Sequence, residues 1–139
     1  MRNLFLLLVL ATLAFAGCSK NVGLKGTVKF DDGQPVPSGI VCFVTDSYMA
    51  RGNIVNGEFK MSSTKEGDGL PPGDYKVYFT GIEVPVGESV ETADGGMSEP
   101  TMVSAIAPKY DSADTSELTQ KVDASTKTIE FTLERNPNL

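Results

Sequence analysis

Few side chains in this sequence could take part in chemistry. The 139 residues include two cysteines, Cys18 and Cys42, and no histidine. Without histidine, the chain lacks the usual general base near neutral pH and the commonest protein ligand of zinc, copper and iron. The chemistry that stays open is that of cysteine sulfur, of serine beside lysine, and of carboxylate oxygens.

Cys18 directly follows an apolar segment. The chain opens with Arg2 and then runs from Leu4 to Ala16 without a charged residue. This run is long enough for the hydrophobic region of a signal peptide, and it is shorter than the roughly 20 apolar residues that a membrane-spanning helix needs. We therefore expect residues 1–17 to be a targeting segment that is removed from the mature protein.

The stretch AFAGC, residues 14–18, resembles the lipobox of bacterial lipoproteins. The resemblance implies that Cys18 carries a lipid on its sulfur and becomes the new N-terminus, with residues 18–23 as a lipidated N-terminus and short tether. Two or three acyl chains make such an anchor stable. Ser19 after the cysteine implies the outer membrane in a two-membrane bacterium. The alternative is a secreted protein cut near Gly17 that keeps a free thiol.

The second cysteine lies in the apolar stretch GIVCFV, residues 39–44. With Cys18 lipidated, Cys42 has no partner for an intrachain disulfide. We expect Cys42 to be a small buried apolar residue, and a redox or nucleophilic role is the alternative.

Two pairs of aspartates offer oxygen ligands for calcium. They are Asp31 with Asp32 and Asp111 with Asp114, and calcium takes six to eight oxygens from carboxylates and carbonyls. The spacing of an EF-hand is missing, and Asp31-Asp32-Gly33 is equally an ordinary turn. They are therefore weak metal candidates, and we expect no cofactor.

A serine–lysine hydrolase is a further possibility, because Ser62, Ser63 and Lys65 are close in sequence. Nothing in the pattern orders them as a nucleophile and a base. We expect that the protein is not an enzyme.

The charge of the mature chain argues against nucleic acid as a partner. Removing residues 1–17 leaves 139 − 17 = 122 residues with 11 basic and 18 acidic side chains, a formal charge of −7. No run of Lys or Arg forms the stripe that phosphate binding needs. The length suits one domain.

Hydrophobic periodicity predicts a molecule made of strands. Apolar residues alternate with period two in most segments, and Asn56-Gly57 predicts a type I′ hairpin turn. No amphipathic helix emerges, so we expect a Greek-key β-sandwich of two antiparallel sheets and about seven strands, immunoglobulin-like or prealbumin-like, with a small barrel as the competitor. The expected strands cover residues 24–30, 39–45, 53–55, 58–61, 75–81, 117–123 and 127–135.

One connection, residues 81–108, is too long for a turn. It holds five acidic residues and no Lys or Arg, and its apolar residues lack a period. We expect a long acidic loop, either solvated and partly disordered or used to bind a partner or a cation.

Three phrases together are similar to the carboxypeptidase regulatory-like domains, relatives of transthyretin (prealbumin). They are LKGTVKFDDGQPVPSGIVCF, VNGEFKMS and LPPGDYKVYFTG. Further on, IAPKYDSADTSELTQKV and KTIEFTLE resemble the C-terminal part of short bacterial lipoproteins with this domain. The resemblance implies one domain over residues 24–135 and a tail over residues 136–139.

Structural roles explain why residues of these types stand at the matched positions. Glycines at 33, 57 and 73 suit turns, prolines fix φ before strands, and Phe59 and Tyr75 suit a core. Tyr110 is expected to bury its ring and bond its hydroxyl to backbone, as a tyrosine corner does. The matched set is Gly26, Gly33, Pro35, Gly57, Phe59, Pro72, Gly73, Tyr75, Pro108 and Tyr110.

Two enzymes on related folds do not fit. Hydroxyisourate hydrolases need histidines and a Tyr-Arg-Gly-Ser-like C-terminus, and intradiol dioxygenases hold iron with two tyrosines and two histidines. The sequence therefore predicts a lipid-anchored module at the cell envelope with a non-enzymatic binding or structural role, whose partners are the membrane and an envelope protein or polysaccharide. The alternatives are a calcium-stabilised adhesion or polysaccharide-binding module and a small Ser/Lys or carboxylate hydrolase.

Overall fold

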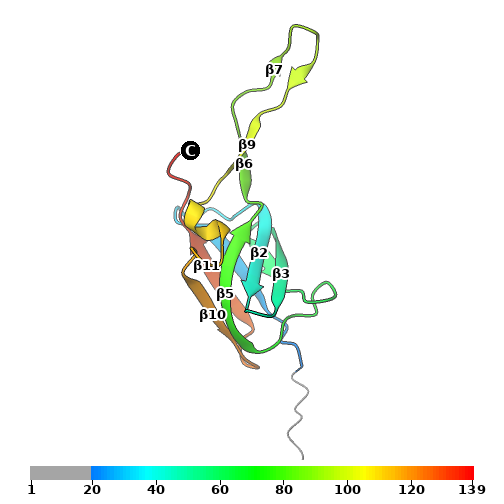
Figure 1. Ribbon diagram of the computed structural model, residues 1–139, viewed down its shortest axis with the longest axis vertical. Helices are drawn as coiled ribbons and strands as arrows, with labels where there is room; N and C mark the ends of the chain where they lie inside the picture. The colour runs from blue at the N-terminus through cyan, green and yellow to red at the C-terminus, as the bar shows by residue number, and fades with distance from the viewer. Residues whose placement is uncertain (1–19) are drawn as a thin grey trace, which may run out of the picture.

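The computed structural model describes residues 20–139, which are built almost wholly from β-strands (Figure 1). The expected targeting segment and Cys18 lie outside the described residues. One short 3-10 turn, η1, covers Pro108–Asp111. The strands are β1 (Lys25–Phe30), β2 (Ser38–Val44), β3 (Met49–Val55), β4 (Glu58–Lys60), β5 (Gly73–Thr80), β6 (Glu83–Val86), β7 (Val90–Glu91), β8 (Met97–Ser98), β9 (Thr101–Ser104), β10 (Leu118–Val122) and β11 (Thr128–Leu133).

Seven of these strands form the main sheet, in the order β10-β5-β2-β3-β4-β1-β11. They are the strands that the period-two pattern predicts. Neighbours are antiparallel except β1 and β11, which run parallel with Lys25 opposite Thr128. The first strand is thus held in place by the last.

The main sheet curls until its two ends face each other. Phe131 of β11 lies near one end of the strand order and Phe79 of β5 near the other, yet their ring centroids are 5.5 Å apart. Phe131 also meets Phe43 of β2 at 6.2 Å. The all-β sandwich prediction is confirmed. Its two layers are one continuous curled sheet with one parallel pair, where we expected two separate antiparallel sheets, because strand twist lets a long sheet fold back on itself.

Burial alternates along the strands as expected. In β1 the positions of Gly26, Val28 and Phe30 are buried, and Lys25 and Thr27 are exposed. Strand β2 differs, because three consecutive residues, 41–43, are buried. Strand β2 is therefore covered on both faces over this stretch.

Glycine is required at particular backbone positions. Asn56 and Gly57 have φ values of 50° and 81°, as a type I′ turn requires. Gly33 has φ 84°. Gly73, which we expected in a turn, is instead the first residue of β5 and has no positive φ. A Cβ on Gly26 would lie 2.6 Å from the Phe59 ring, so this glycine makes room for a core aromatic.

The folded body extends slightly beyond the expected domain limits. The Val22 amide donates to the Leu70 carbonyl at 2.7 Å, and Val22 is buried, so the body begins two residues before Leu24. At the other end, the Asn136 amide donates to the Ala105 carbonyl at 2.9 Å. Asn136 therefore belongs to the body and not to a free tail.

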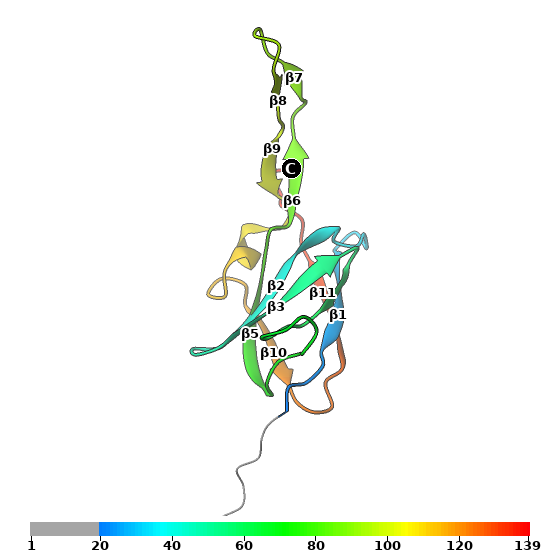
Figure 2. The same ribbon diagram turned by 90° about the vertical axis from the view of Figure 1, so that its right-hand side faces the viewer.

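Residues 81–108 contain a β-hairpin where we expected a loop. Strand β6 pairs with β9, and β7 pairs with β8 farther out. The hairpin, residues 83–104, projects from the body at the end opposite the start of the described chain (Figures 1 and 2). We call residues 83–104 the arm.

Candidate functional site

The root of the arm is fixed to the body. Ile82 and Ile106 are buried on either side of it. The Ala105 amide donates to the Ile82 carbonyl at 2.8 Å, and the Asn136 side-chain amide donates to the Ser104 carbonyl at 2.9 Å. A Cβ on Gly39 would lie 2.4 Å from Ile82 Cγ1, so the missing side chain at position 39 creates the space for Ile82.

The outer part of the arm exposes apolar side chains. Among the described residues, most of the exposed large apolar side chains belong to it: Val86 at 45%, Val90 at 60%, Met97 at 66% and Met102 at 53%. Side chains of this kind normally cluster in a core, and when they gather on a projecting element they mark an interaction surface.

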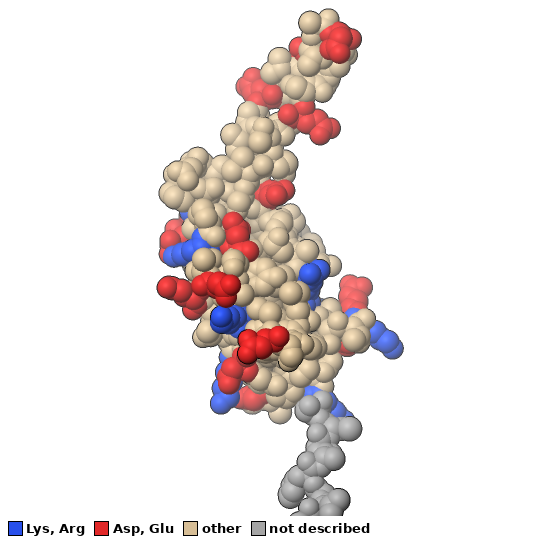
Figure 3. Space-filling model, in the orientation of Figure 1, with Lys and Arg blue, Asp and Glu red and all other residues tan. Residues whose placement is uncertain are grey.

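The arm is also acidic. Figure 3 shows acidic atoms and no basic atoms among the charged groups toward the outer end of the arm. Its carboxylates come from Glu83, Glu88, Glu91, Asp94 and Glu99. The arm thus combines apolar contact area with negative charge, and both would complement a partner that is apolar and basic.

Hydrogen bonds within the arm hold its outer turn. The Thr92 amide donates to the Gly96 carbonyl at 2.7 Å, and Ser98 Oγ donates to the Val90 carbonyl at 3.1 Å. A hydrogen bond from the Thr92 side chain lowers the pKa of Asp94, which keeps this carboxylate charged. The arm therefore has a defined shape without help from the body.

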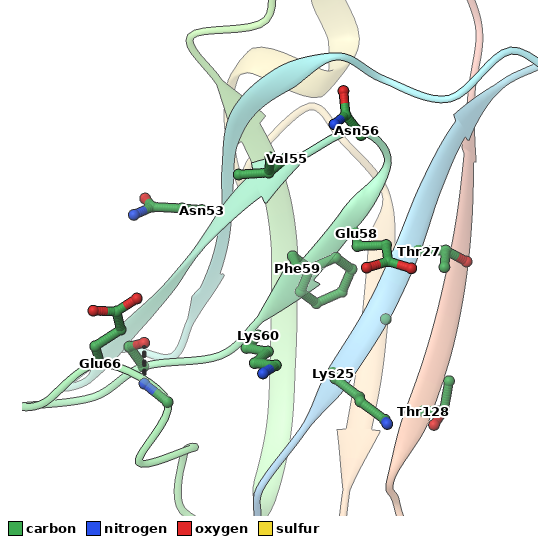
Figure 4. A pocket seen from close by; sticks show the side chains of 13 residues that line it. Lys25, Thr27, Asn53, Val55, Asn56, Glu58, Phe59, Lys60, Glu66 and Thr128 are labelled. Atoms are coloured by element: carbon green, nitrogen blue, oxygen red, sulfur yellow. Dashed lines mark hydrogen bonds between the residues drawn. The ribbon is translucent and has the colours of Figure 1, made fainter.

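A groove of about 640 Å³ lies on the outer face of the body. Side chains from β1, β3, β4 and β11 form its floor, and the loop after β4 forms one wall (Figure 4). Asn53, Asn56, Thr27 and Thr128 supply amide and hydroxyl groups, and the charged side chains are Lys25, Lys60, Glu58 and Glu66. These groups of both charges stand beside the apolar side chains of Phe59 and Val55, and the mixture suits a ligand with polar and apolar parts.

Asp68 makes the wall of the groove rigid. Its carboxylate accepts hydrogen bonds from the amides of Ser63 at 2.6 Å, Thr64 at 3.0 Å and Lys65 at 3.1 Å. The bond from the Ser63 amide is the largest of the effects that hold the pKa of Asp68 well below its usual range. The loop is thus tied around one carboxylate.

Two of the four aspartates considered for calcium, Asp32 and Asp114, lie beside basic side chains. Asp32 accepts from the Arg135 guanidinium at 2.8 Å and from the Gln34 amide, and Arg135 is the main cause of its lowered pKa. Asp114 lies 3.4 Å from the Lys76 ammonium. Burial raises the pKa of Asp111, and Asp31 is exposed. Within residues 20–139, no three His, Cys, Asp or Glu side chains gather as metal ligands would.

The residues considered for a hydrolase make hydrogen bonds within and beside the loop after β4. The Ser62 hydroxyl accepts from the Gly67 amide at 2.8 Å, and the Ser63 hydroxyl accepts from the Tyr48 hydroxyl. Lys65 contributes its backbone amide to Asp68. These bonds shape the loop.

The hydroxyl bond of a tyrosine corner is made by Tyr75. Its hydroxyl donates to the Pro71 carbonyl at 2.7 Å. Tyr110 buries its ring behind Pro108 as expected, but among the hydrogen bonds of residues 20–139 none involves the Tyr110 hydroxyl. The matched phrase LPPGDY contains both Pro71 and Tyr75. The four-residue spacing between them is therefore the sequence signal from which this bond could have been predicted.

Cys42 is buried, as expected for a small apolar residue. Burial is the main cause that raises the pKa of its thiol, which disfavours the reactive thiolate.

The chain was compared with known proteins at three levels. Neither family models, nor curated proteins, nor solved structures gave a match. In the described part of the chain, no helix is long and apolar enough to cross a membrane. What the structure establishes is an all-β sandwich with a projecting hairpin, and its function has to be argued from that geometry.

Proposed function

We propose that this protein is a lipid-anchored, extracytoplasmic β-sandwich module with a non-enzymatic binding role at the cell envelope, and that the arm is the element that binds its partner. The observation that carries the proposal is the arm itself, which is anchored at its root and presents exposed apolar side chains among acidic ones.

The physical reason is the cost of the arm in isolation. Each apolar side chain left in water forgoes about 25 cal/mol per Å² of area that it could bury. Because the arm extends away from the body, only contact with another molecule could bury the exposed apolar area of its side chains. These are Val86, Val90, Met97 and Met102. The five carboxylates favour a partner surface with basic groups, and an envelope protein offers apolar and basic side chains together.

The anchor belongs to the same proposal. The apolar segment before Cys18 and the AFAGC stretch support lipidation of Cys18, with attachment to the outer membrane in a two-membrane bacterium. The resemblance to carboxypeptidase regulatory-like domains agrees with a binding module, because that fold hosts many roles without a catalytic centre of its own.

A polysaccharide is the second candidate partner, and the groove favours it. Its amide, hydroxyl and carboxylate groups could exchange hydrogen bonds with sugar hydroxyls, and Val55 adds an exposed apolar surface beside them. Binding of envelope polysaccharide that is lost in Asn53→Ala but kept in arm variants would assign the sugar to the groove.

The experiment that tests the arm uses a photo-crosslinking amino acid in native cells. We expect a crosslinker at position 86 to give a specific adduct, and one at position 49 to give none. Met49 is the matched control, because it is 41% exposed against 45% for Val86 but lies on the body, outside the groove. Equal labelling at both positions, or none, would remove the arm from the proposal. Mass spectrometry of the native protein tests the lipid on Cys18 separately.

A further inference from the structure

We propose that a row of lysines at the end of the body next to the tether contacts the anionic headgroups of the membrane that holds Cys18, so that the domain stands upright with its arm directed away. The lysine row consists of Lys20, Lys25, Lys60 and Lys127. The proposal rests on the lipid anchor proposed above.

Three of these lysines lie on adjacent strands or at their ends. Lys25 of β1 is directly opposite Lys60 of β4. On the other side, the Lys25 amide donates to the Lys127 carbonyl at 3.2 Å, and Thr128, the residue after Lys127, is opposite Lys25 on β11. Neighbouring strands are about 4.8 Å apart. The register therefore places Lys25 and Lys60 side by side, and Lys127 directly precedes the strand on the other side of Lys25; all three side chains are exposed.

This arrangement is unfavourable for the isolated domain. Like charges directly opposite each other on neighbouring strands destabilise a sheet. The ion pairs within residues 20–139 use Lys29, Lys76, Lys109 and Arg135, and none of them includes a member of the lysine row. Its mutual repulsion is thus not relieved within the described chain, and a surface of negative charge would relieve it.

The position of the lysine row points to the membrane as that surface. Lys20, Lys25 and Lys127 line a shallow hollow of about 420 Å³ together with Asn21, where the described chain begins. The stretch from Cys18 to Val22, where the body starts, spans at most about 14 Å when fully extended. A lipid on Cys18 would hold the lysine row within about one or two Debye lengths of the headgroups.

The acidic groups around the lysine row do not cancel it. Glu58 is opposite Thr27, two residues farther from the tether than Lys60, and Glu66 stands on the far wall of the groove. The Asp123 carboxylate accepts from the Ser125 amide at 2.8 Å and from the Thr126 hydroxyl at 3.2 Å within its own turn.

The rest of the molecule adds to the orientation. The arm lies at the opposite end and carries only acidic charges (Figures 1 and 3). An anionic membrane surface attracts nearby lysines and repels nearby carboxylates. Both effects turn the domain in the same direction, with the lysine row toward the lipid.

The test is lysine footprinting of the mature lipidated protein in vesicles. An amine-reactive reagent labels the protein in vesicles of phosphatidylcholine alone or of phosphatidylcholine with an equal part of phosphatidylglycerol, and mass spectrometry measures the rate at each lysine. We expect labelling of Lys25, Lys60 and Lys127 to be about threefold or more slower in the anionic vesicles, with the difference lost at about 1 M salt. Lys109, near the arm, should react at the same rate in both. Equal rates in the two vesicles, or equal protection in both, would overturn the proposal.

Charge-matched variants extend the test. A label at position 92, at the outer end of the arm, reports the mean distance between the arm and the vesicle surface. When Lys25, Lys60 and Lys127 are replaced by Gln, this distance should be the same for both kinds of vesicle. Replacing Lys29, Lys76 and Lys109 by Gln removes the same charge and should keep the wild-type difference. If native Cys18 proves unmodified, the proposed anchor is wrong. Sedimentation of the unlipidated full chain with the same two kinds of vesicle then tests membrane binding by the lysine row separately. Equal binding to both kinds of vesicle would overturn it.

Discussion

At the scale of single residues, polar side chains in this protein mainly fix loops. Tyr75 is buried on β5 and its hydroxyl reaches back four residues to the Pro71 carbonyl, which ties the start of the strand to the segment before it. Its ring lies 5.8 Å from that of Phe43 in the core. Tyr75 therefore links loop geometry to core packing.

Replacing Tyr75 by Phe should lower the free energy of unfolding by about 0.5–1.5 kcal/mol, because the Pro71 carbonyl loses its donor while the ring stays in place. Urea denaturation of both proteins measures the change. Tyr110→Phe is the matched control and should change the free energy of unfolding by less. A larger loss for Tyr110→Phe than for Tyr75→Phe would contradict this assignment.

Asp68 predicts a pH dependence. Its pKa is lowered in the folded protein, so its hydrogen bonds stabilise the fold above the unfolded pKa of about 4 and are lost as the pH falls through the folded pKa. We expect Asp68→Asn to lower the melting temperature at pH 7 and to reduce the loss of stability on acidification. Glu66→Gln, in the same loop, should leave the melting curves as in the wild type. Parallel pH profiles for Asp68→Asn and wild type would show that this carboxylate does not carry the effect.

At the scale of elements, the sequence allowed the seven strands of the main sheet to be predicted. Apart from β2, they pack one face on the core, so inward and outward residues alternate, as in β5. Only the root of the arm touches the core, through Val84, and the outer arm escaped prediction because neither of its faces packs there. Val86, Val90 and Met97 are exposed. In strands that are exposed on both faces, apolar and polar residues do not alternate in the sequence.

For the lysine row, too, the local pattern within a strand could be predicted, and the pairing between distant strands could not. Period-two alternation alone places Lys25 and Lys60 on the outward side of their strands. That they are opposite each other depends on the pairing of β1 with β4, and β1 and β4 are separated in sequence by two other strands. Register between distant strands follows from the whole fold, which one segment does not specify.

The root and the outer part of the arm should differ in their effect on stability. Ile82→Ala removes a buried side chain and should cost about 2–5 kcal/mol. Replacing residues 87–99 by a short turn removes only exposed residues and should leave the free energy of unfolding within about 0.5 kcal/mol of wild type. Chemical denaturation measures both, and a large loss on shortening would mean that the outer arm supports the body.

At the scale of the whole molecule, Phe131 closes the sandwich. It belongs to the last strand of the sheet and contacts rings from three other strands: Phe43, Phe59 and Phe79. The two layers are thus joined through one side chain as well as through the continuous sheet.

Phe131→Ala should therefore be among the most damaging single substitutions, at about 3–5 kcal/mol. The measurement is again urea denaturation, with Thr132→Ala, an exposed neighbour on the same strand, as the control. Similar losses for the two variants would mean that the layers do not depend on this aromatic cluster.

The parallel pairing of β1 with β11 has a consequence for how the chain is made. Lys25 finds its partner at Thr128, more than one hundred positions downstream, so the first strand stays unpaired on one side until β11 has been synthesised. A domain whose first strand pairs with its last folds slowly, and only after both strands have been made. If it is exported as proposed, it would reach the translocation channel still unfolded, which is the state that threading through such a channel requires.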